Sequence, residues 1–427
     1  NVPDNQNAAE KYTQIASEVE RLDREFLAEQ TKGLEGVTLD TSAEKYILDQ
    51  VLIVGTSHVD ALGPIPEETL KTTEAYWQEV TSRIAPTLQQ IGREVSDASR
   101  YPIDLTQGFD VQLEHLARLR NLARGLSVDA LHWSMAGEAS RATDSIQAQL
   151  ALADSLSKEP ILISQLVRMA ILGIAGKAAE FVTFYDALSD AELLQLQQTL
   201  GQALPPVEQE RILDRAIMGE AAIGLSIVDT PMNWDEPDPD AQPISLHEQG
   251  FFQPIWMFPQ MVFPAEGERM SMIRFYDEAI KAGADLRMSM ERGLRSGWDD
   301  RILEGMQFMS PRAATLLPAI GRAYESEYRI RMLLAMAQTG LGALRFRLAT
   351  GQLPENLEML VPAYVAEIPI DIYTKELKPV SYRKLDNGGC IIYSFGMNRA
   401  DDEGKERNAE KESKADDFAF TVGPVVQ

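Results

Sequence analysis

Residues 8–30 read AAEKYTQIASEVERLDREFLAEQ, and their apolar side chains recur every three or four positions. These side chains are Tyr12, Ile15, Val19, Leu22 and Phe26. The spacing matches the turn of an α-helix, and charged residues fill most of the remaining positions. The stretch therefore predicts an amphipathic helix with one apolar face directed at a core.

The same periodicity continues along the first half of the chain. It predicts further helices over residues 67–91, 109–125, 127–156, 159–188, 190–200 and 205–228. No alternating strand pattern of useful length competes with them. Helical pattern resumes at residue 268 and continues in pieces to about residue 350. We therefore predict a mainly α fold, with a multi-helical domain over residues 1–330.

From Gly351 onward the sequence pattern changes from helical periodicity to short strand-like segments and turns. One of the strand-like segments contains the single cysteine, Cys390. We predict a small α+β module over residues 331–427, joined to the helical domain through a continuous helix. The helix over 331–350 has more apolar side chains than one small sheet can cover, so part of it should face the larger domain. These side chains are Met332, Leu333, Met336, Leu341, Leu344 and Leu348.

Two helical stretches show a weak internal sequence repeat at an offset of 82 residues. Leu122, Leu131 and the triplet Gly137-Glu138-Ala139 recur as Leu204, Leu213 and Gly219-Glu220-Ala221. This repeat is consistent with a degenerate duplication of a helical hairpin, or with coincidence in a chain rich in Ala and Leu. A duplication would present Glu138 and Glu220 from equivalent positions.

Residues 231–264 form a segment rich in proline and aromatic side chains. Its prolines exclude a regular helix or a central strand, so we predict a long loop. Its rings should fold over the helical domain, because a large exposed apolar patch is unfavourable in a monomer. The alternative is a lid or a docking surface.

The 427-residue chain has 40 Lys and Arg against 65 Asp and Glu, a formal net charge of −25. Such a surface repels phosphate backbones and anionic headgroups, so no nucleic-acid partner is expected. A protein or peptide partner remains compatible with this charge. The most apolar run, residues 161–185, is interrupted by Arg168, Lys177 and Glu180, so no membrane insertion is expected either.

Motifs for chemistry are scarce. The chain has no glycine-rich nucleotide loop, H-E-x-x-H, paired C-x-x-C or G-x-S-x-G. Ser57, His58 and Asp60 place a hydroxyl, an imidazole and a carboxylate close together in the sequence. The alternative is that Asp60 caps the next turn. Glu138 and Glu220 could act as a general acid and base if they faced one groove, or each could be a structural carboxylate.

The C-terminal segments follow a recognisable order. GQLPENLEMLVPAY at 351–364 is followed by Ile368-Pro369-Ile370-Asp371, then by IIYSFGMN at 391–398, then by Asp416-Asp417. This order resembles the C-terminal half of the major pseudopilins of type II secretion. The resemblance implies a long helix, a proline-containing turn and a small sheet that ends in a calcium loop. It extends to uncharacterised bacterial extracytoplasmic proteins that append such a module to a large helical domain.

A calcium site is implied by this resemblance at the turn before the last strand. The oxygen ligands would come from Asn398, Asp401, Asp402, Asp416 and Asp417, in keeping with the preference of calcium for anionic oxygen donors. The interval also contains lysines and arginines, so a solvated charge run predicts the same residues. No other cofactor is expected.

Together these patterns favour a non-catalytic binding or scaffolding protein that acts outside the cytoplasm. The chain begins Asn1-Val2-Pro3, without an initiator Met, so we expect that a signal peptide or membrane anchor preceded it. The alternative is a hydrolase that uses acidic residues in a cleft of the helical domain, either Glu138 with Glu220 or the cluster from Ser57 to Asp60.

Overall fold

The computed structural model describes residues 7–30, 67–94, 99, 101–104, 112–185, 188–204, 212–227, parts of 269–281, 311–374, 376–396, 398–405 and 417–423. Within these ranges the protein is mainly helical, with one small antiparallel sheet. Ser57, His58, Asp60, Asp416 and the segment 231–264 lie outside the described residues.

The helical elements follow one another from the N-terminus to residue 360. They are α1 (Ala8–Gln30), α3 (Glu67–Tyr76), the π-helix η2 (Trp77–Thr81), α4 (Ser82–Glu94), α5 (Glu114–Met135), α6 (Ala139–Asp154), α7 (Leu162–Tyr185), α8 (Asp190–Gln202), α9 (Ile212–Ile227), α12 (Pro311–Thr350) and the short 3-10 helix η5 (Leu357–Leu360). Three strands come last, namely β1 (Ser381–Lys384), β2 (Cys390–Ser394) and β3 (Phe418–Val422).

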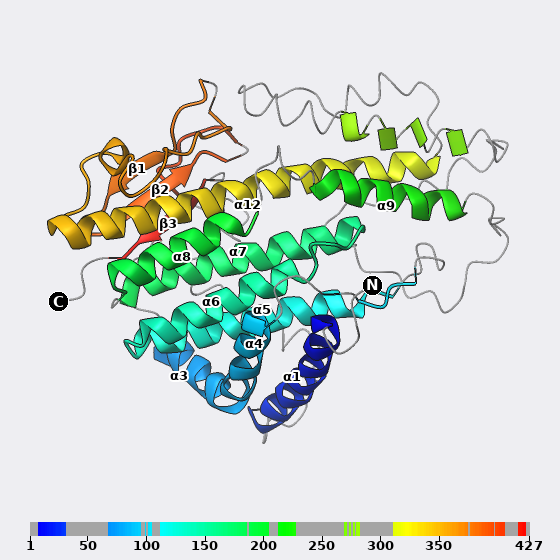
Figure 1. Ribbon diagram of the computed structural model, residues 1–427, viewed down its shortest axis with the longest axis horizontal. Coiled ribbons are helices and arrows are strands. Elements are labelled where there is room, and N and C mark those ends of the chain that lie inside the picture. The colour runs from blue at the N-terminus through cyan, green and yellow to red at the C-terminus, as the bar shows by residue number, and fades with distance from the viewer. Residues whose placement is uncertain are drawn as a thin grey trace.

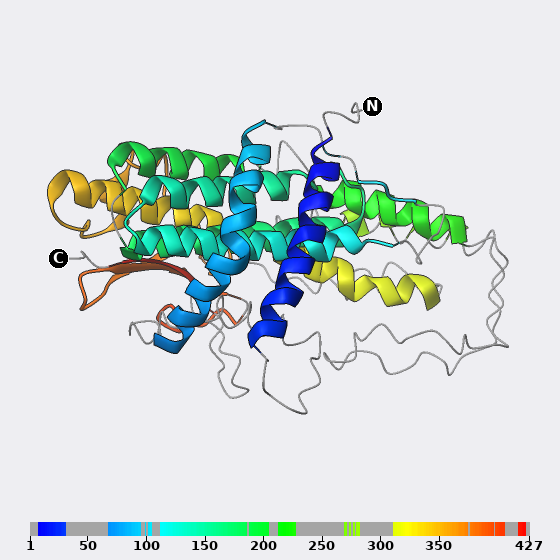
Figure 2. The ribbon, with the colours of Figure 1, turned by 90° about the horizontal axis from the view of Figure 1, so that it is seen from below.

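The centre of the molecule is formed by α5, α6 and α7, which pack against one another. Figure 1 shows α12 and α8 lying along one side of this group, and Figure 2 shows α1 and α4 crossing the bundle. Leu122, Ile146 and Ile171, one from each central helix, are fully buried. The helical periodicity of residues 8–30 is confirmed, since Tyr12 and Leu22 are buried on the inner face of α1.

The predicted boundary between helices near residue 126 is wrong. α5 continues through Gly125 and Leu126, and the chain instead turns at Gly137, whose φ is 73°. A residue with positive φ ends a helix most easily when it is glycine, because glycine has no Cβ to clash. Gly125 lies inside α5, where a Cβ added to it would make an ordinary contact of 3.6 Å with Ile84 Cδ1, so this glycine does not mark a turn.

The two copies of the internal repeat have different local structures. The triplet at 137–139 spans the turn between α5 and α6, with Glu138 at the N-cap of α6. The triplet at 219–221 lies inside α9, where a Cβ on Gly219 would come within 1.6 Å of the Pro160 carbonyl oxygen. The two glycines meet different requirements, so the equivalent positions that a duplication predicts are not observed.

The sheet has the order β1-β2-β3 with antiparallel neighbours. Ile392 in the central strand pairs with Tyr382 on one side and with Phe420 on the other. Cys390 is buried in β2, as its apolar neighbours predict. The sheet packs on α12 so closely that a Cβ on Gly340 would lie 2.5 Å from the Phe420 ring.

Helix α7 covers the outer edge of β3 with side-chain hydrogen bonds. Glu180 Oε1 accepts from the Thr421 amide at 2.7 Å, and Lys177 Nζ donates to the Ala419 carbonyl at 3.1 Å. Thr183 Oγ1 donates to the Thr421 carbonyl and accepts from the Gly423 amide. These side chains satisfy backbone groups that an edge strand would otherwise leave unpaired.

Helix α12 crosses residue 330 without interruption and packs on α7, α8, β2 and β3. The expected shared interface is therefore confirmed. Of the six apolar side chains proposed for it, Leu348 is an exception, with 54% of its surface exposed. The other five are buried, at 7% exposure or less. The C-terminal module and the helical bundle share one apolar core.

Among the described helices, residues 162–184 of α7 have the length and composition of a membrane span, with mean hydropathy 1.4. In this structure 61% of that window is buried inside the protein. Arg168 and Glu180, which interrupt the apolar run, are buried with it at 3% and 1% exposure. α7 thus has the environment of a central core helix.

Candidate functional site

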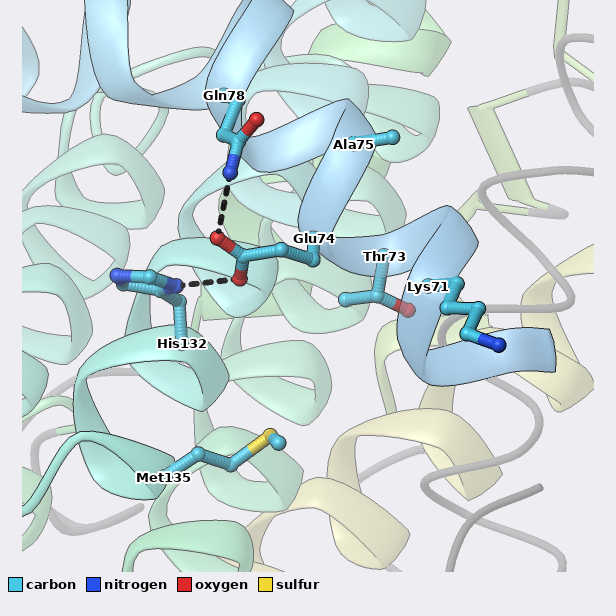
Figure 3. A pocket seen from close by; sticks show the side chains of 7 residues that line it. All are labelled: Lys71, Thr73, Glu74, Ala75, Gln78, His132 and Met135. Carbon is cyan, nitrogen blue, oxygen red and sulfur yellow. Dashed lines mark hydrogen bonds and ion pairs between the residues drawn. The ribbon is translucent and has the colours of Figure 1, made fainter. Parts of the chain in front are cut away.

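A surface hollow of about 410 Å³ lies between α3, the start of η2 and the end of α5. Figure 3 shows the side chains that line it. They are Lys71, Thr73, Glu74, Ala75, Gln78, His132 and Met135. Polar groups converge at one side of this hollow, and the exposed thioether of Met135 borders another.

Glu74 is the central polar group of the hollow. Its Oε1 accepts a hydrogen bond from Gln78 Nε2 at 3.0 Å, and its Oε2 lies 2.9 Å from His132 Nδ1. A carboxylate only accepts hydrogen bonds, so Nδ1 must carry the proton in this contact. In the neutral ring Nε2 is then the acceptor, and the tautomer is set by Glu74.

The side chain of His132 is held in place by Trp77. The two rings stack with centroids 3.4 Å apart and planes 9° from parallel. Trp77 is the first residue of the π-helix η2, where each backbone hydrogen bond spans one residue more than in an α-helix. Such wide turns occur often at functional sites, because they redirect side chains that a regular helix would place elsewhere.

Beneath the hollow, Asp129 of α5 joins four side chains. Its Oδ1 accepts from Trp77 Nε1 at 2.8 Å and from Trp133 Nε1 at 3.1 Å. Its Oδ2 accepts from Ser145 Oγ at 2.5 Å and from Gln89 Nε2 at 3.2 Å. Burial raises the pKa of Asp129, and these hydrogen bonds oppose that rise. The network fixes both tryptophans relative to α4, α5 and α6.

Trp133 has a second contact, on its ring face. The guanidinium carbon of Arg141 lies 3.3 Å from the ring centroid, in a cation–π arrangement. Arg141 belongs to α6, so this contact also ties the end of α5 to the next helix. The hollow therefore lies on a rigid base of rings and hydrogen bonds.

The structure does not bring Glu138 and Glu220 together. Glu138 is exposed at the N-cap of α6, whereas Glu220 Oε1 accepts from the Leu162 amide at 2.9 Å, at the start of α7. The 16-residue helix α6 and residues 155–161 lie in the chain between Glu138 and Leu162. Burial raises the pKa of Glu220, and the Leu162 bond lowers it. Glu220 caps a helix, while Ser57, His58 and Asp60 lie outside the described residues.

The loop before β3 places Asp417 in the interior. This side chain is fully buried, and its Oδ2 accepts from the amides of Asp402 at 3.0 Å and Gly404 at 2.8 Å. Its Oδ1 has no hydrogen-bond partner among the residues that the structure describes. Burial raises the pKa of Asp417 to about 7, with contributions from the charges of Asp402 and Asp401.

The other described oxygen donors of this loop are engaged locally. Asp401 Oδ1 accepts from the Glu403 amide and from the Tyr393 hydroxyl. Asn398 Nδ2 donates to Asp402 Oδ2 at 2.6 Å. Within the described ranges, no group of three acidic, His or Cys side chains is arranged to hold a metal ion. Asp417 Oδ1 is a buried oxygen that could serve as a ligand, and calcium stays a prediction for this loop.

Sequence patterns did not indicate the hollow. Glu74 and His132 are 58 positions apart, on helices whose mutual packing no local pattern encodes. The side chain of His132 is 17% exposed. The one local signal is the Trp133 neighbour, since adjacent polar and aromatic residues near a helix end suit a partly exposed site.

The comparisons with known proteins gave no match, whether to a protein-family model, to a curated sequence or to a solved structure.

Proposed function

We propose that this protein is a non-catalytic binding or scaffolding protein that acts outside the cytoplasm and takes a protein or peptide partner. The hollow beside Glu74 and His132 carries the proposal. It is open to solvent, and its two central side chains are fixed by hydrogen bonding and stacking. A site whose side chains are ordered before binding loses less entropy when a partner docks.

The joined architecture supports a scaffolding role. β3 is fastened to α7 through Glu180, Lys177 and Thr183, and α12 packs on both parts. Gln197 of α8 adds hydrogen bonds to the carbonyls of Gln338 and Tyr364. Surfaces on the bundle and on the sheet are thus held at fixed positions relative to each other.

We also propose that the C-terminal module is of the pseudopilin type and that the protein is exported from the cytoplasm. A long helix, α12, leads into the 351–364 segment and then into an antiparallel sheet. This order is what the resemblance to major pseudopilins implies, and it supports a pseudopilin-type module reused on a helical domain. Export would follow from a signal peptide or anchor, as in the extracytoplasmic proteins that the chain resembles.

A peptide-binding assay tests the proposal. An array of short peptides is incubated with the wild-type protein and with Ala75→Trp, which should fill the hollow. We expect a subset of peptides to bind the wild type and to be lost in the variant, while Glu79→Ala on the exposed face of η2 binds normally. The bound peptides should be recovered unchanged by mass spectrometry.

Two outcomes would contradict the proposal. Peptide binding that persists in Ala75→Trp, with the fold intact by circular dichroism, would place recognition elsewhere. Cleaved peptides would instead favour the hydrolase alternative. For the location, a protease-accessibility assay on cells that express the complete coding sequence should degrade the protein without lysis.

A further inference from the structure

We infer that the hollow between α3 and α5 binds a protonated amine at the end of an aliphatic chain, such as a lysine side chain of a partner. This inference deepens the proposed function and rests on it. It follows from the donor and acceptor character of Glu74 and His132, from the apolar border of the hollow, and from the charge of the protein.

The hollow presents hydrogen-bond acceptors. Each carboxylate oxygen of Glu74 takes one hydrogen bond from the protein, from Gln78 or from His132, and keeps a second lone pair. Both oxygens of the Glu74 carboxylate therefore still have capacity to accept a hydrogen bond from a ligand. An ammonium group supplies three donors and the opposite charge, which makes its hydrogen bonds to a carboxylate strong.

The acceptor geometry is held from below. Trp77 stacks on the His132 ring, and its indole donates to Asp129. His132 therefore cannot turn away from Glu74 without breaking the stack. A carboxylate held in one orientation binds a cation at a smaller entropic cost than a mobile one.

The rest of the hollow suits an aliphatic stem. Met135 is 44% exposed at its border, and Ala75 contributes a small apolar wall. A flexible thioether packs well against methylene groups, and a lysine stem buries its methylenes while its charge stays at a polar group. Lys71 also lines the hollow, but Figure 3 shows its side chain extending away from Glu74.

The charge of the whole protein favours the same ligand. A formal net charge of −25 draws cations toward the surface and repels anions. An anionic ligand would also have to approach the Glu74 carboxylate directly. Long-range and local electrostatics therefore select the same sign of ligand.

Nuclear magnetic resonance of the tryptophan indoles tests the inference on the full chain. The chain has five tryptophans, and Trp77→Phe identifies the Trp77 signal beneath His132. The probes are the acetylated methylamides of lysine, norleucine and glutamate, which share a backbone and differ in the side-chain end. We expect lysine to shift the Trp77 signal in a saturable manner and norleucine to bind at least about tenfold more weakly.

Variants separate the charge from the shape of the hollow. Glu74→Gln should weaken lysine binding by about tenfold, and Gln78→Glu, at an exposed position, should tighten it. Lys71→Ala should tighten lysine binding, because it removes a like charge from the lining of the hollow. Glu79→Gln is the matched control, because Glu79 is exposed and does not line the hollow.

Three results would overturn the inference. They are equal binding of lysine and norleucine, glutamate binding that is lost in Lys71→Ala, and no saturable shift of Trp77 with lysine. None of these results affects the peptide-array experiment, which tests the proposed binding function independently. If peptides bind the wild type and not Ala75→Trp while lysine fails, the binding function stands and the ligand class is wrong.

Discussion

The link between α7 and β3 should control how the two parts of the molecule unfold. Glu180 is 1% exposed, accepts from the Thr421 amide at 2.7 Å and lies 3.1 Å from Lys177 Nζ. Glu180→Ala removes the acceptor of a buried amide and the counter-charge of a largely buried lysine. Breaking such a buried pair costs about 3–5 kcal/mol of unfolding free energy.

Part of this cost can be assigned to single contacts. The hydrogen bond from the Thr421 amide to a charged acceptor accounts for about 1.5–3 kcal/mol. Glu180→Gln keeps an oxygen for that amide and loses only the charge, so it should cost less than Glu180→Ala. Lys177 is 17% exposed and also donates to the Ala419 carbonyl, which limits the penalty of leaving it unpaired.

The assay follows each part of the molecule with its own probe during urea denaturation. Of the five tryptophans, Trp77 in η2 and Trp133 in α5 lie in the helical bundle and report on it. Cys390 is the single cysteine, is buried in β2, and reacts with a thiol reagent only when the sheet opens. In the wild type both probes should give one transition, and Glu180→Ala should move both to lower urea.

A matched control lies on the surface. Glu79 is 62% exposed and pairs with Arg83 at 3.5 Å, so Glu79→Ala should change the unfolding free energy by less than about 0.5 kcal/mol. The reasoning fails if Glu180→Ala behaves like Glu79→Ala. It also fails if Cys390 becomes reactive well before the tryptophan signal changes in the wild type, since the module would then unfold on its own.

Three further predictions concern other regions. Gly219→Ala should lower the unfolding free energy by about 3 kcal/mol or more in chemical denaturation, because a Cβ there would meet the Pro160 carbonyl oxygen; a neutral result would mean that α9 shifts freely. Burial raises the pKa of Asp129, so its contribution to stability is fully present below about pH 4 and is lost as pH rises through the raised folded-state pKa. Asp129→Asn should flatten that loss in urea melts at several pH values, and an unchanged pH dependence would contradict the assignment. Calcium should raise the melting temperature in proportion to the logarithm of its concentration, and the double variant Asp416→Asn and Asp417→Asn should abolish this rise. A wild-type melting temperature that millimolar calcium does not change would contradict the predicted calcium site.

The sequence by itself determined which faces of the helices are buried. Tyr12, Val19 and Leu22 recur at the helical period and are all inside. The same reasoning placed Cys390 in a buried strand and α12 against both parts of the molecule. These features depend on local periodicity and on the amount of apolar surface, and both are readable from adjacent residues.

Only the tertiary structure decided which polar groups meet. Glu74 and His132 are 58 positions apart, and Glu180 and Thr421 are 241 apart. A periodic pattern states that a helix face is buried but does not state which helix covers it, in which register. Glu138 and Glu220 illustrate the same limit, since the same triplet Gly-Glu-Ala lies at the start of α6 in one case and inside α9 in the other. Hydrogen bonds and stacked rings need positions accurate to a fraction of an ångström, and only the packing of whole helices sets those positions.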